Sequence, residues 1–398
     1  MEIKRYTRWT FFSLLSGLLA GLAATVFLYL LDWATNTRDQ FPVLIWGLPI
    51  AGFIIGWVYY KWGQQSDRGN NLILDEIHDP QKTLPLRMAP LVLGGTLLTH
   101  LFGGSAGREG TAVQMGATLS DQLSKFFKIE AFERKILLVT GAGAGFGAAI
   151  GTPWAGVIFG MEVIQVGRLT PFAAIECIIA SFVGYYTTVF LKAPHSEYPL
   201  FEIGNFDFKT FLFIAAAGIF FGLAARIFVF ITHQVENLNS QMIRYPPLRP
   251  LVGGLLLVLF FYLESSNRYV GLGIPVIQEA FTEQAGFRDP ALKAFFTALT
   301  VGSGFKGGEF IPLVFIGTTL GSALSVILPI SFQLLAAVGF AAVFAGASNT
   351  PIACSIMAIE LFGIEITPYA LVACFISFFL SGKKSIYKSQ RFLEKKLL

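Results

Sequence analysis

An arginine and a glutamate lie inside an apolar, glycine-rich run at residues 103–115, which reads GGSAGREGTAVQM. An ionisable group at membrane depth is costly, so it marks a cavity, a partner or a transported ion. Glu109 begins a helix-compatible stretch, and a helix N-terminus presents free N–H groups that favour an anion. A carboxylate tethered there can occupy an anion site and leave it on protonation, which is how a gate behaves. The alternative is an Arg108–Glu109 ion pair that closes the loop.

The composition around this run is that of an integral membrane protein. The chain has 398 residues, of which 54% are hydrophobic and 14% are charged. The apolar runs are continuous and lack the alternation of an outer-membrane barrel, so we expect an all-α polytopic integral membrane protein. Stretches long enough, or nearly long enough, to span a bilayer lie at residues 11–31, 43–60, 172–191, 211–231, 248–263 and 369–380.

Basic residues flank both ends of the chain. Lys4, Arg5 and Arg8 precede the first apolar stretch, which is too long for a signal peptide, and we expect it to be retained. The positive-inside rule then predicts cytoplasmic termini and an even number of crossings. The net charge of +4 gives no reason to expect nucleic-acid binding, and no regulatory domain is expected after the last apolar segment. The C-terminal basic residues are Lys383, Lys384, Lys388, Arg391, Lys395 and Lys396.

The cysteines and histidines do not indicate a metal or cofactor site. The three cysteines lie in apolar spans without paired spacing and are expected to be packing residues. The four histidines are scattered, and no HExxH or similar ligand spacing occurs. No cofactor is therefore expected. These residues are Cys177, Cys354, Cys374, His78, His100, His195 and His233.

Three pairs of segments repeat in the same order, about half a chain apart. Residues 69–73 match 271–275, residues 107–111 match 307–311, and residues 146–162 match 344–360. Such a pattern predicts an internal duplication, with repeats at 1–195 and 206–398. Several repeated segments are too short to cross a bilayer alone, which is typical of broken helices that meet near the midplane of a transporter. An odd number of crossings between the repeats would make them inverted.

These residues resemble the CLC family of chloride channels and anion/proton exchangers. The family pattern is GSGIP, then G(K/R)EGP, then GxFxP, with a late tyrosine that helps to hold the ion. The counterparts here are GNNLI at 69–73, GREGT at 107–111, GEFIP at 308–312 and Tyr387. The resemblance covers nearly the whole chain. It implies a CLC-type inverted-repeat architecture with broken and re-entrant helices, and a homodimer in which each subunit has its own pore.

Four departures from the family pattern resemble the fluoride/proton antiporter branch. Asn70 replaces the serine of the first motif, Thr111 replaces the proline after the gating glutamate, and Glu309 precedes Phe310 in the third motif. Chloride/proton exchangers carry a second proton glutamate at the position of Val163. Two further positions differ from that branch. Some of its members have phenylalanines in the segments near Ile73 and Val276, and neither position is phenylalanine here.

The candidate site combines two carboxylates with an anion-binding group. Glu109 is the expected gating and proton-carrying residue, and Glu309 is the expected second proton site. Fluoride holds its water strongly, so its site needs several short, strong donors, such as the backbone N–H groups of helix N-termini. The expected anion-binding residues are Asn70, Gly107, Arg108, Gly110, Thr111, Phe310, Ile311 and Tyr387.

Each of these assignments has a structural alternative. Asn70 would instead be a helix N-cap. Glu309 would be an ion-pair partner of Lys306. Tyr387 would be an interfacial anchor near the basic C-terminus. Thr111 would either contact the ion or cap its helix, and any single phenylalanine, Phe310 included, would be a packing residue. Glu162 and Glu360, which are equivalent in the two repeats, are expected to be structural residues bonded to backbone or tyrosine.

The function predicted from these features is export of fluoride in exchange for protons, across the inner membrane of a bacterium, by a homodimer in the lipid bilayer. The alternative within the same fold is a chloride channel or chloride/proton exchanger. A cation transporter would use Glu109 and Glu309 as ligands. An intramembrane enzyme would need a nucleophile–base pair or metal triad, and no such motif lies near the glycine-rich segments. The expected dimer contacts are residues 152–163 and 351–362.

Overall fold

The computed structural model describes residues 2–392, so Lys395 and Lys396 of the C-terminal basic group lie outside the described residues. Within this range the protein is helical, with one pair of two-residue strands, and the predicted all-α polytopic class is confirmed. Four helical segments are long and apolar enough to cross a membrane: Tyr6–Gln40, Pro42–His78, Pro171–Phe190 and Phe208–Met242. The protein is a multi-pass membrane protein.

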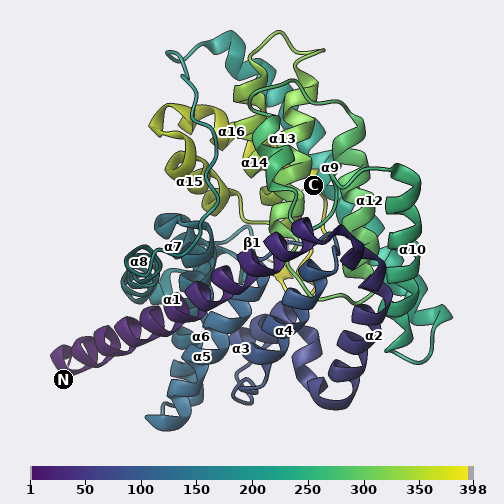
Figure 1. Ribbon diagram of the computed structural model, residues 1–398. Coiled ribbons are helices and arrows are strands. Elements are labelled where there is room, and N and C mark those ends of the chain that lie inside the picture. The colour runs from purple at the N-terminus through teal and green to yellow at the C-terminus, as the bar shows by residue number, and fades with distance from the viewer. Residues whose placement is uncertain (1, 393–398) are drawn as a thin grey trace.

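Helices α1 to α8 form the lower part of Figure 1, and α9 to α16 form the upper part. The first group is α1 (Glu2–Gln40), α2 (Leu48–Val58), α3 (Asn70–His78), α4 (Met88–Leu101), α5 (Glu109–Phe126), α6 (Ala131–Ile150), α7 (Pro153–Glu162) and α8 (Ala174–Phe190). The second group is α9 (Phe208–Met242), α10 (Leu248–Glu264), α11 (Ile274–Glu279), α12 (Arg288–Gly302), α13 (Phe310–Leu324), α14 (Phe332–Ser348), α15 (Pro351–Phe362) and α16 (Thr367–Leu380).

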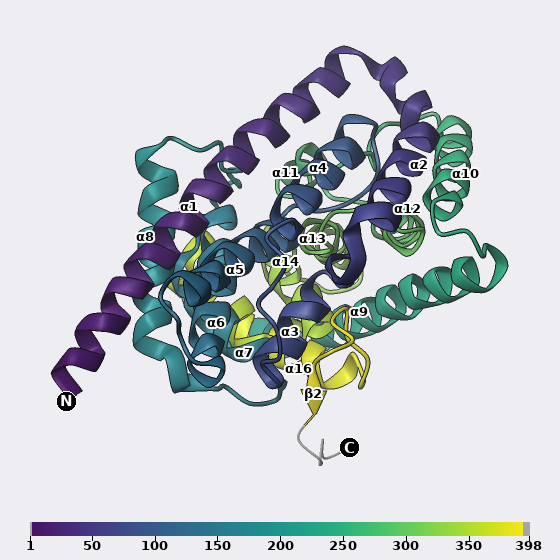
Figure 2. The same ribbon diagram turned by 90° about the horizontal axis from the view of Figure 1, so that it is seen from below.

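Shorter elements complete the chain. The short helices are η1 (Pro42–Gly47), η2 (Tyr59–Gly63), η3 (Gln64–Arg68), η4 (Pro171–Ala173) and η5 (Ile364–Ile366). Strand β1 (Gln165–Val166) pairs in parallel with β2 (Arg391–Phe392) and so holds the C-terminal segment beside the first half of the chain. Figure 2 shows this segment at the same end of the molecule as α3.

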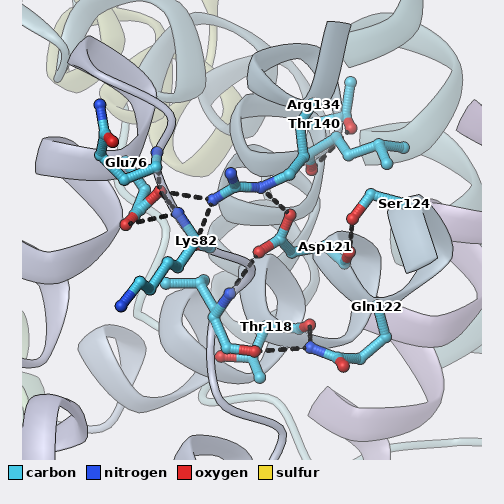
Figure 3. Close-up of polar contacts among 11 residues, drawn as sticks. Glu76, Lys82, Thr118, Asp121, Gln122, Ser124, Arg134 and Thr140 are labelled. Carbon is cyan, nitrogen blue, oxygen red and sulfur yellow. Dashed lines mark hydrogen bonds and ion pairs between the residues drawn. The ribbon is translucent and has the colours of Figure 1, made fainter. Parts of the chain in front are cut away.

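A buried polar network fixes the ends of α3, α5 and α6 that lie away from the site (Figure 3). Arg134 of α6 donates to Asp121 of α5 at 2.6 Å and to Glu76 of α3 at 2.7 Å. Its guanidinium also donates to the carbonyl of Lys82, and Asp121 accepts the backbone N–H of Leu84. Each buried charge is therefore paired and hydrogen-bonded, as burial requires. The network sets how α3 and α5 present their N-terminal residues to the site.

Helices α7 and α15 cap each other through a reciprocal pair of glutamates. Glu162, at the end of α7, accepts the N–H groups of Ile352 and Ala353 at 3.0 and 2.7 Å. Glu360 of α15 accepts the N–H groups of Trp154 and Ala155 at 2.9 and 2.8 Å. Both carboxylates thus bind the otherwise unpaired first N–H groups of a helix. This agrees with the structural role predicted for the two residues.

Replacing Glu162 by alanine is expected to lower stability and to leave ion coupling intact. The change leaves two N–H groups of α15 without acceptors inside the protein, which costs about 1–3 kcal/mol per unsatisfied group. Thermal unfolding of the purified protein measures the effect, and the exposed Glu283→Ala is the matched control. An unchanged melting temperature together with lost proton coupling would assign Glu162 a transport role instead.

The entry of the chain into α9 is fixed by Asp207, which accepts the N–H groups of Lys209 and Thr210 as an N-cap. Bonds from Thr210, chiefly its hydroxyl, hold the pKa of this exposed carboxyl below its ordinary value of 3.8. A lowered folded-state pKa contributes stability above the unfolded value, and that stability is lost as pH falls through the folded value. Asp207→Ala should therefore lower the melting temperature at pH 7 but not below the pKa, whereas Asp207→Asn, which still caps, should lower it less. Equal melting temperatures of the wild type and Asp207→Ala at pH 7 would contradict this role.

Candidate functional site

Two glycine loops, one from each half of the chain, pair at the centre of the molecule. Gly107 donates its N–H to the carbonyl of Gly308 at 2.6 Å, and Gly308 donates back to Gly107 at 2.7 Å. A side chain at Gly107 would lie 3.0 Å from both the Gly308 carbonyl and the Pro312 ring, so glycine favours this close approach. The loops lead directly into α5 and α13. The N-termini of these helices therefore lie close together.

Gly107 was predicted as part of the anion site, and the structure requires a correction. Its N–H is already bonded to Gly308, so it cannot also donate to an anion in this conformation. Its role here is to align the two helices. The N–H groups of Glu109 and Gly110 at the start of α5, and of Phe310 and Ile311 at the start of α13, have no intrahelical acceptor. These are the backbone donors that remain for an anion.

Glu109 is buried at the first turn of α5, with 1% of its surface exposed. Its Oε1 accepts from Nε of Arg108 at 3.2 Å, and its Oε2 accepts the backbone N–H of Arg108 at 3.2 Å. The Arg108–Glu109 ion pair considered from the sequence is therefore present. Ion pairing and gating are compatible, because the pair holds an ionised carboxylate beside the helix N-terminus.

The guanidinium of Arg108 contacts the segment between α8 and α9 rather than a separate anion site. Its terminal nitrogen donates to the Ser196 hydroxyl at 3.1 Å. His195 of the same segment bonds the carbonyl of Ala148 at 2.8 Å, and Tyr198 packs edge-on against Phe340. Arg108 thus differs from the prediction, because its side chain binds Glu109 and this segment.

Asn70 faces the start of α5 from the first position of α3. The N-cap of α3 is Gly69, and no side-chain cap bond is formed, so the alternative role of Asn70 as a cap is wrong. Its Nδ2 lies 3.3 Å from the position that a side chain at Gly110 would occupy. Its Oδ1 is buried without a hydrogen-bond partner. An amide with an unpaired oxygen beside a helix N-terminus can bind a proton donor or water.

Thr111 does not cap α5, which forms no side-chain cap bond, and its contact with the ion stays a prediction. Its hydroxyl shares a hydrogen bond of 2.7 Å with the hydroxyl of Thr96 on α4, and both residues are buried. The contact connects α4 to the first turn of α5. It also places the Thr96 hydroxyl beside Thr111, which is in the same helical turn as Glu109 and Gly110.

Glu309 lines a cavity of about 520 Å³ that is open at one side. Lys306 forms an ion pair with Asp67 at 2.6 Å, so the alternative role of Glu309 as the partner of Lys306 is wrong. Within residues 2–392 the carboxylate of Glu309 makes no hydrogen bond or ion pair. Asn70 and Tyr387 line the same cavity. The cavity therefore brings a free carboxylate, an amide and a phenol together from three distant parts of the chain.

Tyr387 is buried, which excludes the interfacial anchor considered from the sequence. It begins the C-terminal turn that Gln390 holds in place, since the Gln390 amide donates to the carbonyls of Val163 and Ser348 at 2.9 and 2.8 Å. Tyr387 therefore lies at the wall of the cavity that Glu309 and Asn70 also line.

An aromatic cluster surrounds the start of α13. Phe310 packs edge-on against Phe344 and Phe146, with ring centroids 4.7 and 5.6 Å away. Phe146 stacks on Phe159 at 4.0 Å. The side chain of Phe310 is thus a packing residue, as the structural alternative predicted. Its backbone N–H lies at the start of α13. The cluster fixes the Phe310 ring by aromatic packing.

The sequence and the fold of this chain are similar to those of known proteins. A model of the voltage gated chloride channel family matches residues 51–382. The chain belongs to the CLC family. A chloride/fluoride channel protein of Pseudomonas syringae pv. tomato is 45% identical over 390 residues, covering 96% of this chain and 86% of that protein. A crystal structure of a CLC-type fluoride/proton antiporter superposes with a TM-score of 0.94 at 34% identity, covering 98% of each chain. A cyanobacterial chloride/proton antiporter, 20% identical, shares the fold with a TM-score of 0.83 over 96% of each chain.

The CLC position of an inner proton glutamate is apolar in this chain. Val163 is 5% exposed and lines a small cavity of about 20 Å³ together with apolar residues such as Ile73 and Phe159 and with Asn70 and Tyr387. A space of this size has no room for a chain of waters, and a valine side chain cannot carry a proton. A proton pathway through this position is thus disfavoured.

Sequence analysis missed several residues that hold this CLC site together. Thr96 and Ser196 carry no motif, and only the fold brings them to Thr111 and Arg108. His100, a fully buried residue of α4, bonds the carbonyl of Gly107 at 3.3 Å and was set aside with the other scattered histidines. Its position seven residues before Gly107 was the available signal. Long-range contacts such as Gln390 to Val163 had no local signal at all.

Proposed function

We propose that this protein is a fluoride/proton antiporter that exports fluoride from the bacterial cytoplasm through the inner membrane. The observation that carries the proposal is the central pair of carboxylates. Glu109 and Glu309 start α5 and α13, which the Gly107–Gly308 bridge brings together. Two similar proteins support fluoride as the transported anion, because one is a chloride/fluoride channel protein and the other is a fluoride/proton antiporter.

In this proposal Glu109 is the gate. As a carboxylate it occupies the donors at the start of α5 and is held by Arg108. On protonation it loses its charge, so its attraction to the helix N-terminus and to Arg108 weakens. An anion then replaces it, and release of the proton restores the gate. Because the carboxylate and the anion compete for one site, each proton that moves is linked to anion movement.

The anion would be held by the donors that remain free around this site. The N–H groups of Gly110, Phe310 and Ile311 and the amide of Asn70 are short, fixed donors, which suit a small anion that must lose its water. The hydroxyl pair of Thr111 and Thr96 would add a donor by rotation. Tyr387 would donate its phenol at the inner side. Gly107 and Arg108 position this group rather than bind the ion.

Glu309 would hand protons to the opposite side of the membrane from Glu109. Its free carboxylate lines the 520 Å³ cavity, whose rim includes exposed charged residues of η3, α9 and the C-terminal segment. We assign this cavity to the cytoplasmic side, since the basic C-terminal segment lines it with Lys388, and basic segments favour the cytoplasm. Both termini are then cytoplasmic.

The wider architecture is also part of the proposal. The matching order of α1–α8 and α9–α16 supports inverted repeats at 1–195 and 206–398. We further propose a homodimer through faces of α7 and α15, a protein with no enzymatic activity, and no nucleic-acid partner. Cross-linking of the protein in membranes should yield dimers, and recovery of monomers only would contradict the assembly.

A chloride channel or chloride/proton exchanger is the second candidate, because the name of the Pseudomonas relative includes chloride. The test is efflux from proteoliposomes loaded with both anions and followed by two ion-selective electrodes after addition of a potassium ionophore. The proposed function requires fluoride to leave far faster than chloride. Comparable loss of both anions would favour the second candidate.

A further inference from the structure

The large cavity beside Glu309 contains a second carboxylate that the proposed mechanism has not used. Glu236 lies on α9 and lines the cavity, one turn after Thr232 and His233, which line it too. Residues spaced by three and four share one face of a helix, so α9 presents all three to the cavity. Glu236 is half-exposed, and it thus contacts both the outside solution and the cavity.

Glu236 differs from Asp67, the other carboxylate that lines this cavity with Glu309. Asp67 is paired with the largely buried Lys306, whereas the partner of Glu236 is the half-exposed Lys388. Glu236 itself is paired with Lys388 at 2.6 Å. The other titratable and charged residues that face this cavity are His233 of α9, Arg68 of η3, Arg249 of α10, Tyr59 of η2 and Tyr387.

The cavity offers a polar route between the two carboxylates. A volume of about 520 Å³ holds several water molecules, each of which needs only a small fraction of it. The Thr232 hydroxyl, which lines the cavity, is buried without a hydrogen-bond partner, and so is Oδ1 of Asn70 on the far side. Unpaired buried polar atoms of this kind are satisfied by water. Protons can move along such a chain of hydrogen bonds.

From these observations we propose that Glu236 relays protons between Glu309 and the solution on the cavity side. The inference rests on the proposed function. In the inward step Glu309 releases its proton to cavity water, Glu236 accepts a proton from that water, and Glu236 then releases it to the solution. The reverse sequence loads Glu309. No bond other than O–H bonds forms or breaks, and Glu236 acts through Glu309 without contacting the anion.

Lys388 makes a structural alternative testable, because it follows Tyr387 directly. The Glu236–Lys388 ion pair connects α9 to the C-terminal segment, so loss of Glu236 would also loosen that segment. Lys388→Met removes the same ion pair but keeps the carboxylate. The two variants therefore separate proton transfer from the holding of Tyr387.

The experiment measures fluoride efflux and proton uptake in proteoliposomes over a range of pH on the cavity side. Glu236→Gln should slow both fluxes together, by about 100-fold, the lower end for a positioned proton donor. The fluoride-to-proton ratio should stay that of the wild type, and the loss should deepen as pH rises and protons become scarce. Glu236→Asp should restore most of the rate. Lys388→Met and Glu279→Gln, a carboxylate paired with Arg268, should remain near the wild type.

Two outcomes overturn the inference alone. One is a wild-type rate at every pH in Glu236→Gln, while the wild-type protein and its coupling behave as proposed. The other is equal loss in Lys388→Met and Glu236→Gln, which assigns the effect to the ion pair. A wild-type protein that moves fluoride without protons would instead overturn the proposed function, and this inference with it.

Discussion

Replacing Glu109 by glutamine is expected to reduce proton movement to the background of protein-free liposomes. Glutamine keeps the size of the side chain and its hydrogen-bonding atoms but cannot carry a proton. Glu109 is the buried carboxylate beside the free N–H groups of α5, so no other group at that helix end can take over its titration. Any fluoride flux that remains should be passive, following the fluoride gradient and the voltage only.

Proteoliposomes with an internal pH dye and a fluoride electrode measure this result. The matched control is Arg108→Gln, which breaks the same ion pair but leaves the carboxylate in place. That variant should alter the rate while protons still accompany fluoride. Coupled flux in Glu109→Gln at the wild-type ratio would remove the gating mechanism and leave the ion pair as a purely structural feature.

Replacing Glu309 by glutamine should likewise abolish proton movement while the protein remains folded. Its carboxylate makes no hydrogen bond or ion pair within the described residues, so the substitution breaks no such contact and should change stability little. The apolar surroundings of Val163 provide no substitute proton site. The inner half of the proton pathway would then be missing.

Asp67→Asn is the matched control for Glu309→Gln, because Asp67 is another carboxylate of the same cavity wall. Its loss leaves Lys306 unpaired, which is expected to lower the melting temperature but to keep the fluoride-to-proton ratio. The pair of variants is compared by melting temperature and by coupled flux. Equal losses of coupling in both would indicate a general effect of cavity charge and would contradict a specific role for Glu309.

The sequence was sufficient to predict the fold class and to select the two carboxylates as candidates, for a physical reason. Burial of an ionisable group in an apolar, glycine-rich run is costly, so the occurrence of Glu109 and Glu309 in such runs indicated candidate functional residues. The short, interrupted apolar segments likewise indicated broken helices before any contact was known. The equivalent positions of Glu162 and Glu360 suggested a structural role, and the structure gives each one two backbone N–H groups.

The details that the sequence left open depend on pairing between distant segments. Nothing local indicates that Gly107 pairs with Gly308 and so gives up its N–H, or that Lys306 pairs with Asp67 rather than Glu309. Asparagine is a favoured helix cap, and only the structure places Gly69 at that position and leaves the Asn70 oxygen unpaired. Glu236 belongs to a long apolar helix whose inward face is set by tertiary packing.

Uphill proton movement driven by fluoride tests the central claim most directly. Proteoliposomes are prepared with equal pH on both sides, an outward fluoride gradient, and equal potassium concentrations with ionophore, which clamp the voltage at zero. An antiporter must then take protons into the vesicles as fluoride leaves, so the internal pH falls below the external pH. The account predicts this acidification in the wild type and its loss in Glu109→Gln. Fluoride efflux with no change in internal pH would contradict coupled exchange and make the protein a channel.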